Sequence, residues 1–316
     1  DRILKAQALV GKKGCVIPWY ILTSDATHAD TVKYFEDNQF FGLNKNDVKF
    51  FQQGMLPALN KQGKVLLESR RRVALSPNGN AGVYLALETS GMIDDMEKRG
   101  LRWIHQYGVD NCLVMPADPV FIGFVAEENA DVASKVVPKS HPDEPVGVLC
   151  MRDKKPAVAE YTELDANARS LRDEATGKLV YSASHICVNA FSVEFLRKHA
   201  RSPLPFHVAF KKVPYCGGVN GETVHPAMSN GYKAEMFIFD AFQYATHMKA
   251  LLVPREEHFA PLKNPVGSKA DCPETCREML YKLHRSWLES VEAKIVLSAT
   301  PEDNLSLIHI SQGIVR

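Results

Sequence analysis

The sequence predicts an α/β fold in which helices cover a mostly parallel, mixed β-sheet on both faces. Short apolar runs rich in β-branched and aromatic residues alternate with stretches of helical periodicity through the first 137 residues. Such βαβα order is typical of doubly wound sheets, whose ligands bind beyond the carboxyl ends of the strands. With 316 residues, the chain is long enough for one large domain of this kind.

Local patterns predict the first elements. Residues 15–22 (CVIPWYIL) are an apolar run typical of a buried strand, and residues 28–35 have helical spacing after Thr27, a suitable N-cap. Residues 76–82 (SPNGNAG) form a loop by their turn chemistry. The same patterns predict further strands at residues 48–51, 64–67, 103–109 and 133–137, and further helices at 83–88, 92–98 and 118–127.

Beyond residue 137, the patterns predict strands at 147–151, 158–161 and 185–191, and helices at 193–198, 234–244 and 273–288. The periodicity stops after Lys294. Residues 305–311 (LSLIHIS) resemble the translation of a sequencing adapter, with a genuine C-terminal strand as the alternative. We therefore expect a core over residues 1–294 and an unpacked tail, foreign to the native protein, over residues 295–316.

Composition argues against two classes of protein. The formal net charge is +1 and the basic runs are short, which disfavours a nucleic-acid-binding protein. No apolar stretch reaches the roughly 18 residues that a membrane span needs. Seven cysteines, an odd number, are scattered along the chain, which suits free thiols in a reducing cytoplasm. Cys272 and Cys276 are close in sequence, but without a second Cys or His pair they do not predict a zinc site.

Two loops at strand ends carry groups that suit a nucleotide. Gln52 and Gln53 end a strand in the run FFQQGMLP, and their amides can donate to and accept from the edge of a base. They can equally be polar residues that cap the strand. Gly79 lies in the loop PNGNAG before a helix, where a small residue lets the backbone approach an anion. Many surface turns have the same composition.

A carboxylate and two lysines are candidates for phosphate chemistry. Asp110 ends a predicted strand, the usual place to hold Mg²⁺ against phosphates, although an aspartate there can also cap a helix. Lys233 and Lys263 can each offset phosphate charge, while an isolated lysine is more often a surface residue. Phe237 and Phe239 alternate along the chain and can stack on a sugar ring, but core packing is the stronger interpretation.

Taken together, these motifs are specific. In order, the chain contains IPWY from Ile17, FFQQGMLPAL from Phe50, PNGN from Pro77, VDN from Val109, EPVGV from Glu144, EY from Glu160, FIFD from Phe237 and FAPLKN from Phe259. In this order, and over about residues 1–290, they resemble the eukaryotic UDP-N-acetylglucosamine pyrophosphorylases. The resemblance implies a Rossmann-like, three-layer nucleotidyltransferase core.

The resemblance also implies an activity. It is the transfer of uridylate from UTP to N-acetylglucosamine-1-phosphate, with Mg²⁺ as cofactor and these small molecules as partners. Such chemistry relies mostly on positioning and charge neutralisation. The positions that match the nucleotide contacts are Gln53, Leu75 and Gly79. Those that match the sugar pocket are Asn80, Gly147, Glu160, Tyr161, His185, Phe237 and Phe239. Asp110 matches the metal ligand, and the catalytic lysines that face the phosphates are Lys233 and Lys263.

The chain departs from the family pattern in several places. Asn78 stands where the family has Asp, and Ala81 where it has Gly. Ser184 and His185 replace a sugar-contacting Gly-Asn pair, which leaves open an enzyme of other or broader sugar specificity. The family's Gly-rich loop with its catalytic arginine matches sequence upstream of Asp1, and its C-terminal domain has no counterpart here. We therefore expect an inactive fragment of an enzyme, with a non-catalytic UDP-sugar-binding module as the alternative from another class.

Overall fold

The computed structural model describes residues 2–9, 16–217 and 221–293. The chain divides into two compact units, one formed by Asp1–Gly108 with Val114–Arg255 and the other by Val109–Leu113 with Glu256–Arg316. The domain boundary predicted at residue 294, and the tail predicted after it, lie outside the described residues. Within the described ranges, no helix is both long and apolar enough to cross a membrane.

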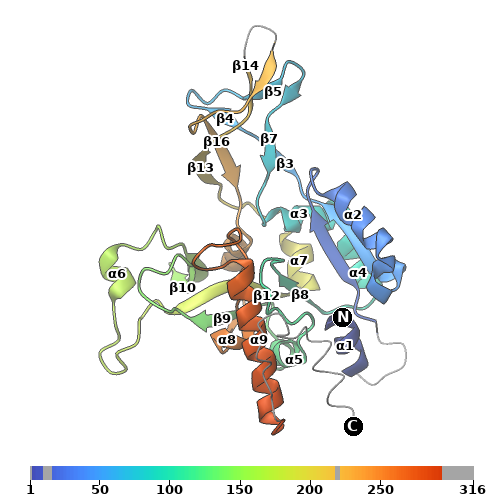
Figure 1. The fold of residues 1–316 in the computed structure, drawn as a ribbon, viewed down its shortest axis with the longest axis vertical. Coiled ribbons are helices and arrows are strands. Elements are labelled where there is room, and N and C mark those ends of the chain that lie inside the picture. The colour runs from blue at the N-terminus through green and yellow to red at the C-terminus, as the bar shows by residue number, and fades with distance from the viewer. Residues whose placement is uncertain (1, 10–15, 218–220, 294–316) are drawn as a thin grey trace. The chain divides into compact units, whose positions relative to one another are not determined.

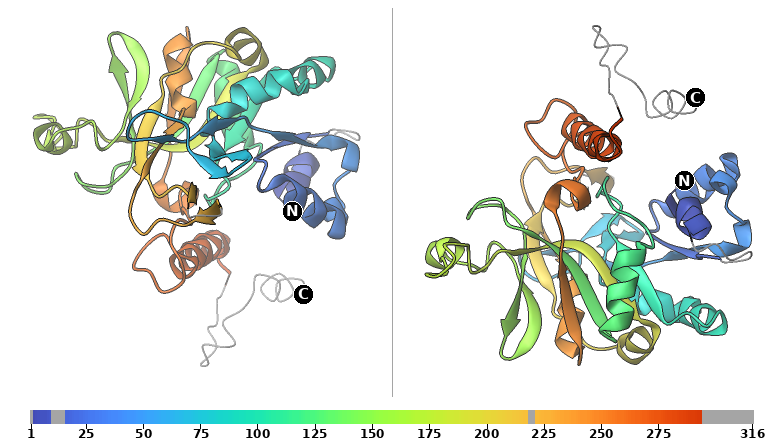
Figure 2. Two further views of the ribbon diagram at one scale, coloured as in Figure 1. Left: turned by 90° about the horizontal axis from the view of Figure 1, so that it is seen from above. Right: turned by 90° about the horizontal axis from the view of Figure 1, so that it is seen from below.

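A six-stranded mixed sheet forms the centre of the larger unit (Figure 1). Its strands are β8 (Trp103–Tyr107), β9 (Val132–Pro138), β10 (Val148–Arg152), β11 (Lys155–Ala159), β12 (Ala183–Ser192) and β17 (Met248–Leu252). β12 lies between β9 on one side and β8 and β10 on the other, and it is antiparallel to all three. β11 is the antiparallel neighbour of β10, whereas β17, the orange strand beside β9 in Figure 2, is parallel to β9.

The prediction of a mostly parallel sheet is therefore wrong for neighbouring strands. β8, β9, β10 and β17 share one direction, but β12 is inserted among them in the opposite one, so antiparallel pairs dominate among the described strands. The chain reaches β12 through the hairpin of β10 and β11 and a long excursion that includes α6 (Ala166–Ser170). Because β11 and β12 are both antiparallel to β10, this connection crosses β10 and joins two parallel strands that are not neighbours.

The N-terminal part keeps the predicted parallel order. Its elements are α1 (Arg2–Leu9), β1 (Trp19–Thr23), α2 (His28–Asp37), two short 3₁₀ turns η1 (Gln39–Gly42) and η2 (Lys45–Asp47), and β2 (Val48–Gln52). β1 pairs in parallel with β2, and α2 lies between them in sequence. Phe35 of α2 is buried, with its ring centroid 5.4 Å from that of Trp19 and 5.1 Å from that of Phe50. This small aromatic cluster holds the helix on its strands.

Four helices that pack on the central sheet or on one another match predicted ones. They are α3 (Gly82–Thr89), α4 (Met92–Lys98), α5 (Pro119–Glu127) and α7 (Val193–His199). The main apolar core contains Tyr84 of α3, Met96 of α4 and Phe191 of β12, each at most 3% exposed. Asp118 caps α5 by accepting the Val120 N–H at 3.0 Å, as expected for an aspartate at this position.

Several short strands form smaller sheets beside one another at one end of this unit (Figure 1). They are β3 (Met55–Pro57), β4 (Leu59–Asn60), β5 (Leu67–Ser69), β6 (Arg72–Val73), β7 (Leu75–Pro77), β13 (His207–Lys211), β14 (Tyr215–Gly217), β15 (Glu222–Val224) and β16 (Gly231–Glu235). The strand predicted at residues 64–67 begins only at Leu67. The helix predicted at 234–244 is also wrong. Its first residues belong to β16, which pairs with β13, and the rest is a 3₁₀ helix, η3 (Ile238–Tyr244).

The smaller unit is built around α9 (Pro273–Ser290), which matches a predicted helix. Its core includes Leu113, Ala260 and Leu283 of α9. The side chain of Asn111 accepts the Ala260 N–H at 3.0 Å through Oδ1, and its Nδ2 donates to the His258 carbonyl at 2.8 Å. Asn111 therefore ties the short segment at residues 109–113 to the chain before α9.

Candidate functional site

The loop at residues 78–81, called the glycine loop below, lies directly against the chain that follows β16. The Met236 N–H donates to the Asn78 carbonyl at 2.9 Å, and the Ala81 N–H donates to the Met236 carbonyl at 3.0 Å. Gly79 lies between these two bonds with φ at +87°, and a Cβ there would be 2.4 Å from the Met236 oxygen. Glycine is required because any side chain would collide with the protein's own backbone.

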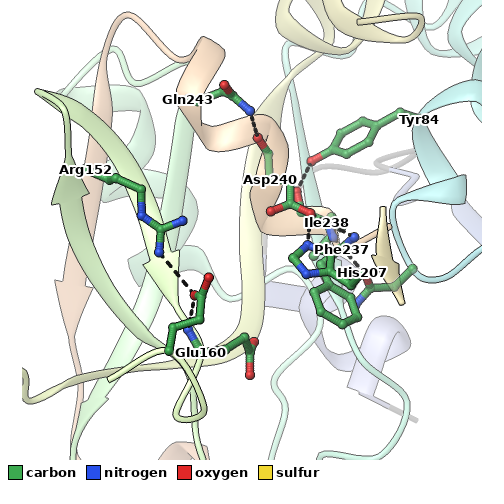
Figure 3. Close-up of polar contacts among 10 residues, drawn as sticks. Tyr84, Arg152, Glu160, His207, Phe237, Ile238, Asp240 and Gln243 are labelled. Atoms are coloured by element: carbon green, nitrogen blue, oxygen red, sulfur yellow. Dashed lines mark hydrogen bonds and ion pairs between the residues drawn. The ribbon is translucent and has the colours of Figure 1, made fainter. Parts of the chain in front are cut away.

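Asn80 fastens the glycine loop to the start of η3. Its Oδ1 accepts the Ile238 N–H at 2.7 Å. The hydroxyl of buried Tyr84 donates to the Ile238 carbonyl, also at 2.7 Å (Figure 3). Both backbone groups of Ile238 are thus held by side chains from the loop and the helix that follows it, and this brings Gly79 and Asn80 beside the aromatic motif FIFD.

Phe237, the first residue of that motif, is held by two neighbours (Figure 3). The imidazole of His207 stacks on its ring with the centroids 4.1 Å apart and the planes 22° from parallel. His207 Nε2 lies 2.8 Å from Asp240 Oδ2, which also accepts the Phe237 N–H at 3.1 Å. The Phe239 ring is 5.3 Å from that of Phe237. Sequence reasoning missed His207 and Asp240. The motif FIFD marks Asp240, whereas no motif marks His207.

Gly147 and Glu160 lie together where β10 begins and β11 ends. A Cβ on Gly147 would be 2.7 Å from Val158 Cγ1 and 3.1 Å from Glu160 Oε1, so a larger residue would displace the Glu160 side chain. The Glu160 N–H donates to Glu163 Oε2 at 2.9 Å. Tyr161 follows with 41% of its surface exposed. The structure thus brings together Gly147 and Glu160, and it leaves Tyr161 facing solvent.

His185 is buried, with 9% of its surface exposed. Its backbone N–H donates to the Gly147 carbonyl at 2.9 Å, and its ring meets the Phe239 ring edge-on at 5.6 Å. Its Nε2 is 3.0 Å from Asn189 Oδ1, which also accepts the Ser134 hydroxyl at 2.6 Å. Since that amide oxygen can only accept, His185 donates from Nε2 and leaves Nδ1 as an acceptor. Burial lowers the pKa of His185 to about 4, so the ring is neutral at pH 7.

Three further residues that match nucleotide or phosphate contacts lie in the larger unit. Gln53 is half-buried just after β2, and its N–H donates to the Thr23 carbonyl at 2.9 Å. Leu75 begins β7 with 50% of its surface exposed. Lys233 is half-buried in β16, directly opposite Ala209 of β13. Each of these residues has surface that a ligand can reach.

Asp110 and Lys263 belong to the smaller unit. The Leu262 N–H donates to the Asp110 carbonyl at 2.9 Å, which places Lys263 one residue from that bond. The half-buried Asp110 carboxylate has no hydrogen-bond or ion-pair partner in the part of the chain that the structure describes. No cluster of three or more His, Cys, Asp or Glu side chains suited to a metal occurs among the described residues. A single unpartnered carboxylate fits Mg²⁺, which commonly takes one or two protein carboxylates and completes its shell with water and phosphate.

Comparison with known proteins shows which family and which relatives this chain is similar to. The family model described as UTP–glucose-1-phosphate uridylyltransferase matches residues 2–288. A Dictyostelium discoideum protein named "Probable UDP-N-acetylglucosamine pyrophosphorylase" is 44% identical over an alignment of 309 positions, which covers 93% of this chain and 63% of that protein. The human "UDP-N-acetylhexosamine pyrophosphorylase-like protein 1" is 43% identical, over 91% of this chain and 57% of the human protein.

Solved structures agree with these relatives. A crystal structure of the uridine diphosphate N-acetylglucosamine pyrophosphorylase from Trypanosoma brucei superposes with a TM-score of 0.83 and 31% sequence identity. The match covers 92% of this chain and 59% of the trypanosomal one. The chain therefore spans about three-fifths of the length of each of these three proteins.

Proposed function

This chain belongs to the UTP–glucose-1-phosphate uridylyltransferase family, and we propose that the protein that carries it is a UDP-N-acetylglucosamine pyrophosphorylase. In the proposed reaction, a phosphate oxygen of N-acetylglucosamine-1-phosphate attacks the α-phosphorus of UTP. The bond from that phosphorus to the leaving oxygen breaks, and pyrophosphate is released. UTP and the sugar phosphate are the proposed partners, and the free thiols of the six cysteines that the structure describes favour a cytoplasmic location.

One observation supports this proposal above the others: Asn80 and Tyr84 hold Ile238 by both of its backbone groups. This contact joins the loop proposed to bind the nucleotide to the aromatic motif proposed to meet the sugar. A nucleotidyltransferase accelerates its reaction mainly by holding its two substrates in line. Hydrogen bonds that fix the nucleotide subsite to the sugar subsite therefore suit the reaction.

We assign the nucleotide to Gln53, Leu75 and Gly79. The Gln53 amide has both the donor and the acceptor that a uracil edge requires. The sugar is assigned to three groups of residues. The first is Asn80, and the second is Gly147 with Glu160 and Tyr161. The third is His185 with Phe237 and Phe239. Phe237 is half-buried and Phe239 is buried in the core behind it, and an aromatic ring next to polar groups is typical of a ligand pocket.

Charge neutralisation is assigned to Lys233 and Lys263, which carry the cations that a triphosphate requires. Asp110 would hold Mg²⁺, which, when bound, offsets the negative charge that develops on the phosphate oxygens. The protein's own part is to fix these groups beforehand. For Asp110, the bond from Leu262 and the Asn111 contacts fix the backbone on which the carboxylate is carried.

A second candidate is the same reaction with other or several sugar phosphates. Buried His185 stands where the family has Asn, and the human relative is named for N-acetylhexosamines. A non-catalytic UDP-sugar-binding module is the alternative from another class.

The test is pyrophosphate release from UTP and Mg²⁺ by the longest natural form of the protein. Three acceptors would be compared: N-acetylglucosamine-1-phosphate, N-acetylgalactosamine-1-phosphate and glucose-1-phosphate. The proposal expects the highest kcat/KM with N-acetylglucosamine-1-phosphate. A preference for another acceptor would support the second candidate. Binding of UDP-N-acetylglucosamine without turnover of any acceptor would support the binding module.

A further inference from the structure

We infer that His207 is a positioning residue of the sugar subsite, which holds the ring of Phe237 at the angle at which it meets the sugar. The inference rests on the proposed function, because the proposed function makes Phe237 a sugar-contacting residue.

His207 makes two contacts with this segment at once. Its ring stacks on the Phe237 ring at 4.1 Å, with 22° between the planes. Its Nε2 is 2.8 Å from Asp240 Oδ2, and because an ionised carboxylate only accepts, the nitrogen is the donor. The stacking sets the plane of the Phe237 ring, and the hydrogen bond prevents the imidazole from turning away.

Asp240 couples these contacts to the backbone. The same Oδ2 that bonds to His207 accepts the Phe237 N–H at 3.1 Å, at the N-terminal end of η3. Without the imidazole, Asp240 would still hold the Phe237 backbone, and the bond between Asn80 and Ile238 would still hold the start of η3. Loss of His207 is therefore expected to free the ring of Phe237 and to leave the 3₁₀ helix in place.

The strand register puts His207 on the same face as a proposed phosphate-binding residue. β13 and β16 are antiparallel, with His207 opposite Glu235 and Ala209 opposite Lys233. Alternate residues of a strand share one face, so His207 and Lys233 lie on the same face of this ladder. Val208 is 62% exposed on the opposite face. His207 thus belongs to the side of the strands that the proposed substrates would use.

Three substitutions separate the two contacts. His207→Phe keeps a flat ring for stacking and loses the donor. His207→Gln keeps an amide donor and loses the ring, and His207→Ala loses both. The matched control is His199→Ala. His199 stacks on Tyr244, with the centroids 5.1 Å apart and the planes at 11°, at the other end of η3.

The measurements are kcat, KM for each substrate, and the Tm of each variant, in the longest natural form of the protein. We expect His207→Ala to raise KM for N-acetylglucosamine-1-phosphate about tenfold, while kcat and KM for UTP change less than about twofold. His207→Phe should restore most of the lost affinity, and His207→Gln should not. His199→Ala should leave all kinetic constants unchanged.

An unchanged KM for the sugar phosphate in His207→Ala would overturn this inference alone, and so would an equal rise in both KM values together with a lower Tm. The same kinetic effect from His199→Ala would also overturn it. Rescue by His207→Gln but not by His207→Phe would do the same. A wild-type protein that turns over no sugar phosphate would overturn the proposed function and this inference with it. Isothermal titration with UDP-N-acetylglucosamine separates failure of this inference from failure of the proposed function. If the wild type binds this ligand and His207→Ala binds it with the same Kd, only the positioning role is refuted.

Discussion

The side-chain oxygen of Asn80 accepts a hydrogen bond of 2.7 Å from the backbone N–H of Ile238, 158 residues further along the chain. Ile238 is 1% exposed, so water cannot replace this acceptor. A buried donor that loses its partner typically costs about 1–3 kcal/mol. Asn80 therefore has a structural task in addition to the sugar contact proposed for it.

Asn80→Ala should lower the free energy of unfolding by about 1–3 kcal/mol and kcat/KM by about tenfold or more, because the joint between the two subsites is loosened. Asn80→Asp keeps an acceptor and should retain most of the stability. Urea unfolding and steady-state kinetics measure both effects. Asn44→Ala is the control, since Asn44 accepts from the exposed Asn46 N–H at 2.9 Å and should cost about 1 kcal/mol or less. Equal losses in the two Ala variants would contradict the role of Asn80.

Gly79→Ala should be strongly destabilising. Gly79 has φ at +87°, and an added Cβ would lie 2.4 Å from the Met236 carbonyl oxygen. Gly63 offers a matched control, because it has φ at +74° with nothing within 4 Å of the added atom. Gly63→Ala therefore reports backbone strain alone, about 1 kcal/mol, and Gly79→Ala should cost at least about 2 kcal/mol more. Chemical unfolding compares them, and similar losses would mean that the glycine loop can move away from Met236.

Elements with local signals were predictable from the sequence. α4 has the predicted bounds, Met92–Lys98, and α5 begins at Pro119, one residue after the predicted start at Asp118, which is its N-cap. The failures come from contacts that are distant in sequence. The spacing of residues 234–244 is helical, yet Glu235 pairs with His207 in a strand. The direction of β12 depends on where the excursion after β11 returns, which local periodicity does not encode.

The candidate site also contains residues that local sequence signals identify and residues that only long-range contacts identify. Gly79 could be singled out because its turn chemistry is local, although the backbone that it approaches belongs to Met236. Asp240 lies within a recognisable motif. His207 could not be found, because its partners are Phe237 and Asp240, and only the fold brings β13 beside them. Local signals thus predict which loops matter, and long-range packing decides what supports them.

Asp110→Asn should raise the Mg²⁺ concentration required for half-maximal rate by about tenfold or more, because a neutral amide oxygen binds this cation more weakly than a carboxylate. Kinetics at varied Mg²⁺ measure the shift. Asp25→Asn is the control, since Asp25 is an exposed turn residue of the larger unit. An unchanged Mg²⁺ requirement in Asp110→Asn would remove Asp110 from the metal site.

His185→Asn should change the choice of sugar. His185 lies beside Gly147 and Phe239, and its neutral ring is larger than an amide. We expect the ratio of kcat/KM between N-acetylglucosamine-1-phosphate and glucose-1-phosphate to shift by about tenfold, the value of one changed hydrogen bond. Competition assays with both acceptors measure the ratio. A ratio that stays constant would place the ring outside the sugar pocket.

Two buried histidines should make stability depend on pH. Burial lowers the pKa of His185 from 6.5 to about 4, and burial, with Lys135 nearby, lowers that of His105 to about 4. Between these pH values the unfolded chain binds protons on both rings and the folded chain does not. The part of the free energy of unfolding that depends on these two neutral rings is therefore fully present above about pH 6.5, and it is lost as the pH falls toward 4. Each ring accounts for roughly 3 kcal/mol of this loss.

Replacing one ring should remove about half of the pH dependence that the two rings cause. Urea unfolding of His185→Asn between pH 7 and pH 4.5 should give a smaller loss of stability than the wild type, by up to roughly 3 kcal/mol, whatever the effect of the substitution at pH 7. The quantity compared is the change with pH, so a cavity left by the imidazole does not enter it. His225→Asn is the control for the substitution itself, because His225 is an exposed residue outside the core. A slope in His185→Asn equal to that of the wild type would mean that the His185 ring takes up its proton in the folded protein as readily as in the unfolded one. The bond from Nε2 to Asn189 Oδ1 would then have to survive protonation, with the charged ring reaching solvent through Nδ1.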